Sequence, residues 1–232
     1  MRRRHPISAD EESFIRSLVG EVRDVSANAT IVGRGDPLRN SILLLDGWVA
    51  RQKVLPDGDA HISQLHIAGD FVDLHGFTLK RLDHDLVALT GCRLGLVRHE
   101  RLAEMVERFG YLTQAYWFAT NLDAAISREW TVSLGRRDAL ARTAHLFCEL
   151  LVRHQVAGLA DDNSYAFPLT HERLSQCLGM TPVHLNRVLQ ELRSRGVITL
   201  AGKRLTINHR AALEDIAEFD PEIGRASCRE RV

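Results

Sequence analysis

The sequence predicts an α+β protein: an N-terminal antiparallel β-roll of the jelly-roll type, a long helix, and a C-terminal winged helix-turn-helix. Three observations support this. Short apolar runs separated by Gly, Asp and Pro fill residues 24–98, a helical pattern follows to about residue 133, and two short helices precede a hairpin. A chain of 232 residues is long enough for two domains. The expected boundaries are 14–100 for the roll, 101–134 for the long helix and 135–215 for the winged helix-turn-helix.

Composition excludes several classes of protein. The chain is 45% apolar and 26% charged, as in ordinary globular proteins. No run approaches the roughly 18 apolar residues of a membrane span, and no signal-peptide pattern follows Met1, so we expect a cytoplasmic protein without a membrane partner. The cysteines form no C-x-x-C pair, which argues against a zinc site, a disulfide framework and a cysteine-ligated iron–sulfur cluster. They are Cys92, Cys148, Cys177 and Cys228.

The first part of the chain has the pattern of a β-roll. Residues 41–45 are followed by a turn at Asp46-Gly47, and residues 61–67 alternate strictly between outward and inward positions. Two more apolar runs, 86–89 and 92–97, complete a series of short strands joined by Gly and Asp turns. This series predicts an antiparallel roll or barrel. Such a roll either encloses one small ligand or is filled by its own side chains.

An apolar stripe marks residues 101–133 as one long helix, because no Gly or Pro interrupts the segment after Gly110. A stripe of this length predicts a two-stranded coiled coil. The alternative is a helix that packs along its own roll. Asp123 is the one polar interruption. The stripe consists of Leu102, Phe109, Tyr116 and Trp130, with Leu112, Ala119 and Ile126 as a second seam.

Residues 171–190 have the spacing of a helix-turn-helix. Thr170 is the expected N-cap of the first helix, and Gly179 lies where the chain must turn sharply. Thr181 opens the second helix, with Pro182 in its first turn, where a missing N–H costs nothing. Two helices locked at a steep angle leave one face of the second helix free for the major groove of DNA. The expected buried positions are Leu174, Ser175, Leu178, Met180, Leu185 and Val188.

The segment after this motif strengthens the prediction of DNA binding. Gly196 is a natural C-cap, and residues 197–200 and 205–207 read as two strands around a turn at Ala201-Gly202. Charge is also concentrated here. Residues 136–210 carry 11 Lys and Arg against 6 Asp and Glu, although the whole chain has 30 of each. The sequence therefore predicts a winged helix that binds double-stranded DNA.

The order of these elements resembles the Crp/Fnr family of bacterial transcriptional regulators over about residues 14–210. The resemblance implies a cyclic-nucleotide-binding-like sensor roll, a dimerisation helix and a homodimer on a pseudo-palindromic operator, with RNA polymerase as a further partner. It also implies that a signal sensed by the roll reorients the winged helices. The motifs that carry it are Gly33-Arg34-Gly35-Asp36, Leu45-Asp46-Gly47, Ala68-Gly69-Asp70-Phe71, residues 87–92, Gly135-Arg136-Arg137 and residues 169–196.

The roll departs from the relatives that bind cyclic AMP, which carry a Gly-Glu pair for the ribose and an Arg-Ser pair for the cyclic phosphate. Asp73 follows Val72 at the first place and retains part of the ribose role. Leu82-Asp83 stands at the second, where a carboxylate repels a phosphate, and Arg81 compensates only if the loop shifts. We therefore expect an effector other than cyclic AMP, an unknown small molecule bound near these four residues, or no effector. The N-terminal cysteine cluster of iron–sulfur relatives is also absent.

Within the second helix of the motif, Arg187 matches the arginine with which the family contacts bases, and its two-pronged guanidinium suits guanine. Pro182 and Val183 replace an Arg-Glu pair, so at most they sense a thymine methyl or the shape of the groove. Asn186 contacts adenine or a phosphate, and Gln190 lies on the same face. The expected phosphate contacts are Thr170, Thr181, His184, Lys203 and Arg204.

Other functions have less support in the sequence. The alternative to a DNA-binding regulator is a cyclic-nucleotide-responsive receptor module that regulates a partner protein, which Leu82-Asp83 disfavours. No H-x-H pattern of a cupin-like enzyme appears in the strands, so we predict no catalytic residue, metal or cofactor. Residues 221–232 are expected to be a non-native or disordered tail. Five roll histidines are either metal or haem ligands or, more simply, turn residues and partners of Asp: His61, His66, His75, His84 and His99.

Overall fold

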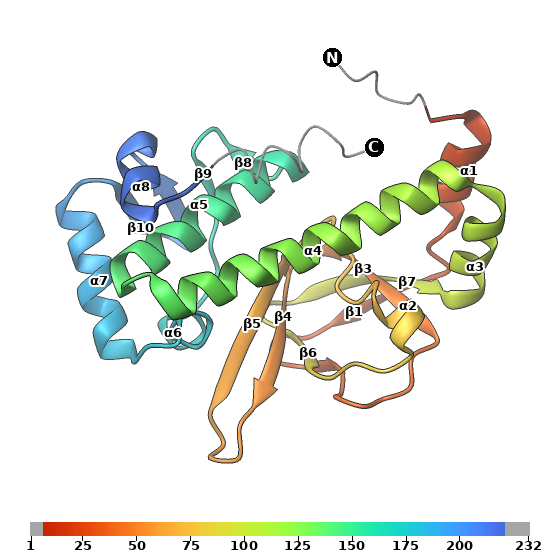
Figure 1. The fold of residues 1–232 in the computed structure, drawn as a ribbon, viewed down its shortest axis with the longest axis horizontal. Coiled ribbons are helices and arrows are strands. Elements are labelled where there is room, and N and C mark those ends of the chain that lie inside the picture. Colours follow the sequence, from red (N-terminus) through yellow and green to blue (C-terminus); the bar gives the residue numbers. More distant parts are fainter. Residues whose placement is uncertain (1–6, 221–232) are drawn as a thin grey trace. The chain divides into compact units, whose positions relative to one another are not determined.

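The computed structural model describes residues 7–220, so the expectation for the tail at 221–232 lies outside the described residues (Figure 1). The chain divides into two compact units. We call them the roll unit, which includes residues 7–58 and 63–126, and the C-terminal unit, which includes residues 59–62 and 127–220. The division falls inside one long helix, which contributes residues to both units.

The roll consists of two antiparallel sheets, as the sequence predicted. The first has three strands in the order β1-β7-β3 and the second has four in the order β2-β6-β4-β5. Residues of both sheets, with Val72 and Leu82 from the connections, form one buried apolar cluster. The strands are β1 (Glu21–Val25), β2 (Thr30–Val32), β3 (Asn40–Asp46), β4 (Trp48–Val54), β5 (Ala60–Ile67), β6 (Asp85–Ala88) and β7 (Cys92–Arg98).

A one-residue turn at Gly47 joins β3 to β4. Its φ of +94° is a conformation that L side chains rarely adopt. A Cβ atom at this position would also collide with the backbone oxygen of Gly91 and come within 2.8 Å of the Cys92 sulfur. The Leu45-Asp46-Gly47 motif therefore requires glycine for two separate reasons.

Three short helices accompany the roll: α1 (Ala9–Ser17), α2 (Gly76–Leu79) and α3 (His99–Arg108). Ser8 and Glu11 form a capping box at the start of α1, which satisfies backbone N–H groups that the helix itself leaves unpaired. Phe14 of α1 and its C-cap Leu18 pack with Leu102 and Met105 of α3 in a second buried cluster. This cluster holds the helices to the roll.

The long helix differs from the prediction of one helix over 101–133. The structure has α3 and a separate α4 (Gly110–Arg136), with Phe109 between them at φ −128° and ψ 86°. The Phe109 ring packs on Phe14 at 4.8 Å between centroids. Burying this ring directs the chain out of the helix just before Gly110, a weak helix former.

Part of the predicted apolar stripe packs against other elements of the same chain. Leu102 and Leu112 are each only 1% exposed, Tyr116 packs in the same cluster of the roll unit, and Trp130 is buried in the C-terminal unit. These four residues therefore pack within their own chain, whereas Ala119 of the predicted second seam is exposed and Ile126 is half-buried. A different stripe is left uncovered or half-covered on α4: Phe118, Leu122, Ala125 and Val132.

The C-terminal unit follows the predicted order of elements. Asp138 caps α5 by accepting a hydrogen bond from the Ala141 N–H. A four-stranded antiparallel sheet has the order β10-β11-β9-β8, and Phe147, Tyr165 and Phe167 fill the core between it and α5. The elements are α5 (Ala139–Ala157), β8 (Ala160–Asp161), β9 (Ser164–Ala166), α6 (His171–Leu178), α7 (Pro182–Ser194), β10 (Ile198–Ala201), β11 (Arg204–Ile207) and α8 (Arg210–Ala217).

Two glycine substitutions separate backbone strain from steric clash in the roll. Gly58, at φ +89°, has nothing within 4 Å of an added Cβ, so Gly58→Ala should cost about 1 kcal/mol of unfolding free energy. Gly47→Ala adds the collision with Gly91 and should cost roughly 2–4 kcal/mol in total. Urea unfolding of the two variants measures the difference. Equal losses would show that the turn relaxes around the added methyl group.

Candidate DNA-binding interface and the interior of the roll

Side-chain and glycine caps set the geometry of the helix-turn-helix as the sequence predicted. The Thr170 hydroxyl accepts from the Arg173 N–H at 3.2 Å, and the Thr181 hydroxyl accepts from the His184 N–H at 3.3 Å. Gly179 ends α6 in the left-handed conformation, with φ +57°. Pro182 occupies the first turn of α7. Each helix end is therefore fixed by its own local sequence.

The two faces of α7 differ sharply in burial. Its inner face, Leu185, Val188, Leu189 and Leu192, is at most 5% exposed. Val183 on the other face is 64% exposed, although it is apolar. All the candidate contact residues of this helix and its cap are exposed. Two of them, at the start of the helix, are apolar and the others are polar. They are Thr181, Pro182, Val183, His184, Asn186, Arg187 and Gln190.

The hairpin β10–β11 turns one residue later than predicted, at Gly202-Lys203, with φ +58° at both residues. This turn exposes Lys203 at the tip. Arg204, the next residue, donates to Asp161 at 2.7 Å and to the Ser164 hydroxyl at 3.3 Å. The two predicted phosphate contacts of the wing thus differ, because the guanidinium of Arg204 already has an anionic partner.

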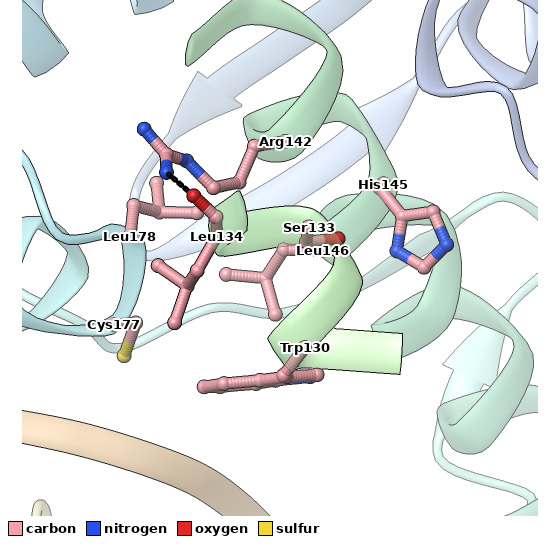
Figure 2. A pocket seen from close by; sticks show the side chains of 8 residues that line it. All are labelled: Trp130, Ser133, Leu134, Arg142, His145, Leu146, Cys177 and Leu178. Carbon is pink, nitrogen blue, oxygen red and sulfur yellow. Dashed lines mark hydrogen bonds between the residues drawn. The ribbon is translucent and has the colours of Figure 1, made fainter. Parts of the chain in front are cut away.

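Polar contacts join the end of α4 to α5 within the C-terminal unit. Arg137 donates to Glu129 and to Ser133, both at 2.7 Å, and His145 lies 3.4 Å from Glu129. Burial and, to a smaller extent, the nearby Arg137 cation lower the pKa of His145 to about 4. Figure 2 shows the side chains that line a small, partly open space of about 10 Å³ beside these groups, about the room that one water molecule needs.

The turn of the helix-turn-helix packs against the same junction. A Cβ at Gly179 would lie 3.2 Å from Leu134, and Leu134, Cys177 and Leu178 line the small space in Figure 2. Trp130 donates its indole N–H to Glu149 at 2.7 Å, and Arg153 donates to the other oxygen of Glu149. The last turns of α4 are therefore an integral part of the C-terminal unit.

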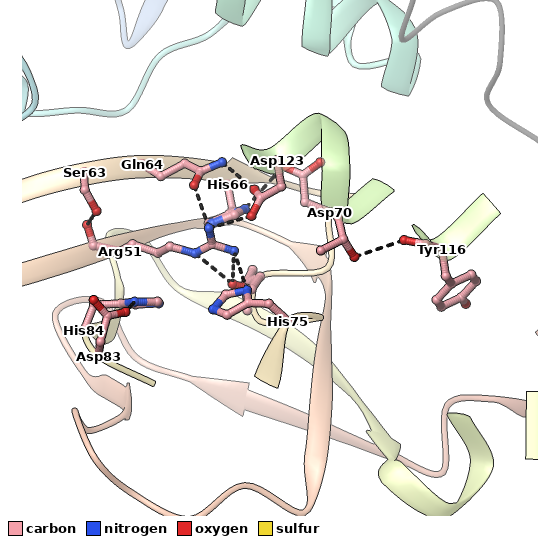
Figure 3. Close-up of polar contacts among 12 residues, drawn as sticks. Arg51, Ser63, Gln64, His66, Asp70, His75, Asp83, His84, Tyr116 and Asp123 are labelled. Carbon is pink, nitrogen blue, oxygen red and sulfur yellow. Dashed lines mark hydrogen bonds and ion pairs between the residues drawn. The ribbon is translucent and has the colours of Figure 1, made fainter. Parts of the chain in front are cut away.

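The interior of the roll contains a polar cluster that the sequence did not predict (Figure 3). Arg51 of β4 is 7% exposed and donates to Gln64 of β5 and to Asp123 of α4, each at 2.6 Å. Gln64 in turn donates to the other oxygen of Asp123 at 2.5 Å. The available signals were Asp123 as the polar break in an apolar stripe and Arg51 as a cation directly after the apolar run 48–50.

The four predicted effector residues differ in their burial and in their partners. Asp73 is fully buried and accepts from the Ile42 N–H at 2.6 Å, and its burial raises its pKa to about 7. Leu82 belongs to the apolar core. Asp83 is exposed and binds Lys53 at 2.6 Å, a hydrogen bond that holds its pKa well below the usual range. Arg81, also exposed, donates to the Gly35 carbonyl.

Two of the five roll histidines lie beside aspartates, as the simpler interpretation predicted. His84 contacts Asp83 at 2.9 Å, and His66 lies 3.8 Å from Asp70. Within residues 7–220, no group of three or more His, Cys, Asp or Glu side chains is arranged to hold a metal ion. The same part of the chain contains no helix long and apolar enough to cross a membrane.

Comparisons with known proteins agree with this architecture. The profile of the cyclic nucleotide-binding domain matches residues 22–109, and that of the Crp-like helix-turn-helix domain matches residues 141–216. These matches define a transcriptional regulator with a sensor-type roll and a helix-turn-helix. The chain belongs to the Crp/Fnr family.

Individual relatives are distant but cover most of the chain. Transcriptional activator protein FnrL of Cereibacter sphaeroides is 28% identical over 190 residues, which span 80% of this chain and 75% of that protein. The fumarate and nitrate reduction regulatory protein of Escherichia coli is 20% identical over 214 residues, 91% and 85% of the two chains. The structure of FixK2 from Bradyrhizobium japonicum shares the fold, with a TM-score of 0.76, 21% identity and coverage of 84% and 96%.

The low pKa of His145 predicts an acid sensitivity of the C-terminal unit. Because the folded-state pKa of about 4 lies below the value of an unfolded histidine, about 6.5, the unfolded chain binds a proton more readily between these values. The free energy of unfolding should therefore fall as the pH drops from 6.5 towards 4. His145→Gln should make this fall less steep in urea titrations at several pH values.

The matched control is His171→Gln, which replaces an exposed histidine of the same unit. It should keep the wild-type slope of unfolding free energy against pH. If His145→Gln had the same slope as this control, His145 would titrate normally in the folded protein.

Proposed function

We propose that this protein acts as a homodimer that binds a pseudo-palindromic operator in double-stranded DNA, one α7 helix per half-site. The observation that carries the proposal is the exposed face of α7, which presents Asn186, Arg187 and Gln190 opposite a fully packed inner face. Major-groove recognition by a helix-turn-helix uses the N-terminal part of such a helix. Because DNA and RNA polymerase are the expected partners, the site of action is the cytoplasm, and no catalytic role is assigned.

Base recognition rests on a small part of that face. Arg187 is exposed and suits the O6 and N7 atoms of guanine, and Asn186 suits adenine. The 64% exposed Val183 offers methyl groups to a thymine methyl in the major groove. Thr170, Thr181, His184, Lys203 and Arg204 then contact phosphates, which set the position of the helix but read no bases.

The dimer contact is proposed for the uncovered stripe of α4. Phe118, Ala125 and Val132 are spaced by seven residues, the spacing of a coiled-coil seam, and Leu122 lies between them. Trp117 beside this stripe is 68% exposed, which is unusual for so large an apolar side chain. A second copy of α4 packed here would remove these side chains from water.

Replacing Arg187 should weaken and broaden DNA recognition. Arg187→Ala should cost about 1–3 kcal/mol in operator binding and relax preference at one base pair of each half-site. Selection of binding sites from random DNA, followed by affinity measurement at fixed salt, tests both parts. Arg193→Ala, an exposed arginine near the C-terminal end of the same helix, is the control and should keep the wild-type base preference.

The outcome of that selection also tests the function as a whole. A wild-type protein that enriches no DNA sequence would contradict operator binding. A variant with wild-type selectivity would move base recognition away from Arg187 and leave the function standing.

Trp117→Glu should dissociate the dimer, because a charge would have to be buried against the partner helix. Light scattering during size-exclusion chromatography should then report a single 26.1 kDa chain where the wild type reports twice that mass. Val54→Glu changes a 51% exposed apolar residue at the end of β4 and should leave the mass unchanged. Equal masses for wild type and Trp117→Glu would contradict the assigned interface.

A further inference from the structure

All the N–H groups of the Arg51 guanidinium have hydrogen-bond partners inside the roll unit. An arginine carries five N–H donors, and here each has an acceptor. Nε donates to the Val72 carbonyl at 3.2 Å, and Nη2 donates to the same carbonyl at 2.8 Å and faces His75 Nδ1 at 3.5 Å. Nη1 donates to the side-chain oxygens of Gln64 and Asp123, each at 2.6 Å. Figure 3 shows these contacts converging on one side chain.

His75 can accept this bond because it is neutral. Burial and, to a smaller extent, the adjacent Arg51 cation lower the pKa of His75 to about 4. Burial raises the pKa of Asp123, but Arg51, His66 and His75 together lower it below its usual value, so the carboxylate stays ionised. The cluster therefore holds one cation and one anion with their hydrogen bonds satisfied.

Asp123 connects this cluster to α4. Its two carboxylate oxygens are bound separately, one by Arg51 of β4 and the other by Gln64 of β5. Two bonds in different directions fix the orientation of the carboxylate, and with it the rotation of α4 about its own axis. Apolar packing at Leu112 and Tyr116 tolerates a small rotation of the helix more easily, because dispersion contacts have little directionality.

The rotation of α4 about its axis matters because its different faces contact different partners. Leu112 and Asp123 lie towards the roll unit, whereas Phe118, Ala125 and Val132 form the proposed dimer stripe. The helix is continuous from Gly110 to Arg136, so a rotation at Asp123 is transmitted to its C-terminal turns. Breaking the ion pair would also leave a charge buried without its partner, which would favour rearrangement around it.

We propose that Arg51 and Asp123 are positioning residues that hold α4 in the orientation required for operator binding, and that no anionic effector is needed for this. The inference rests on the proposed function. An anionic effector would have to displace Asp123 from Arg51, since the arginine has no free donor. The internal carboxylate thus takes the place that a bound anion would have on this arginine.

The test uses the full-length protein and the operator that the wild type selects. Wild type, prepared with no added nucleotide, should bind this operator, and added cyclic AMP or cyclic GMP should change its Kd less than twofold. Asp123→Asn and Arg51→Gln should each weaken operator binding at least tenfold. The double variant should be no weaker than either single variant, because both changes break one shared interaction.

Several controls separate positioning from loss of folding. Circular dichroism and thermal unfolding should show that the Asp123→Asn protein remains folded at the assay temperature. Asp123→Glu keeps the charge and should recover most of the affinity. Glu21→Gln removes an exposed ion pair with Arg23 on β1 and should bind as wild type does. Hydrogen exchange should increase in residues 116–126 of Asp123→Asn but not of Asp123→Glu.

Each possible result decides the proposal. Folded Asp123→Asn with wild-type affinity, or additive losses from the two single variants, would overturn it. A wild type that binds its operator only after a cyclic nucleotide is added would also overturn it, while operator binding itself would stand. A wild type that selects no DNA would contradict the proposed function instead, so the two failures are distinguishable.

Discussion

The structure depends on the limited surface of a single helix. A helix of 3.6 residues per turn offers its side chains in a fixed angular order, and α4 must divide them among several partners. Leu112 and Tyr116 pack in the roll unit, and Trp130 and Ser133 belong to the C-terminal unit. Phe118 and Ala125 are only half-buried and Val132 is exposed, so neither unit covers them fully. The role of a residue on α4 therefore depends on the face of the helix on which it lies.

Features that depend on neighbours in the chain were predicted well from the sequence. Caps and turns are determined by neighbours in the chain, and Thr170, Gly179 and Thr181 have the roles that their residue types indicate. Alternating and helical periodicity likewise gave the roll and the order of the winged helix. The wing turn was misplaced by one residue, because Ala201-Gly202 and Gly202-Lys203 are both acceptable hairpin turns from sequence alone.

The errors have a common physical origin. Periodicity shows that one face of a helix is apolar but not which element covers it, so it assigns Leu112 and Trp130 to a dimer seam although both are buried within their own chain. The break at Phe109 depends on a ring that packs on Phe14, far away in sequence. The Arg51–Asp123 pair joins residues 72 positions apart. Such contacts arise only when the tertiary structure brings the residues together, and a single sequence carries no direct record of them.

The wing has one further consequence, for the thermodynamics of association. DNA binding gains free energy when basic side chains displace the cations condensed around phosphates, which makes affinity fall as salt rises. Arg204 already neutralises Asp161 at 2.7 Å. If it moves to a phosphate, the abandoned carboxylate attracts a cation from solution, and the net release of ions at that contact is close to zero. Lys203 and Arg204 are adjacent in sequence, yet in the proposed complex only the lysine would contribute fully to the salt dependence of binding.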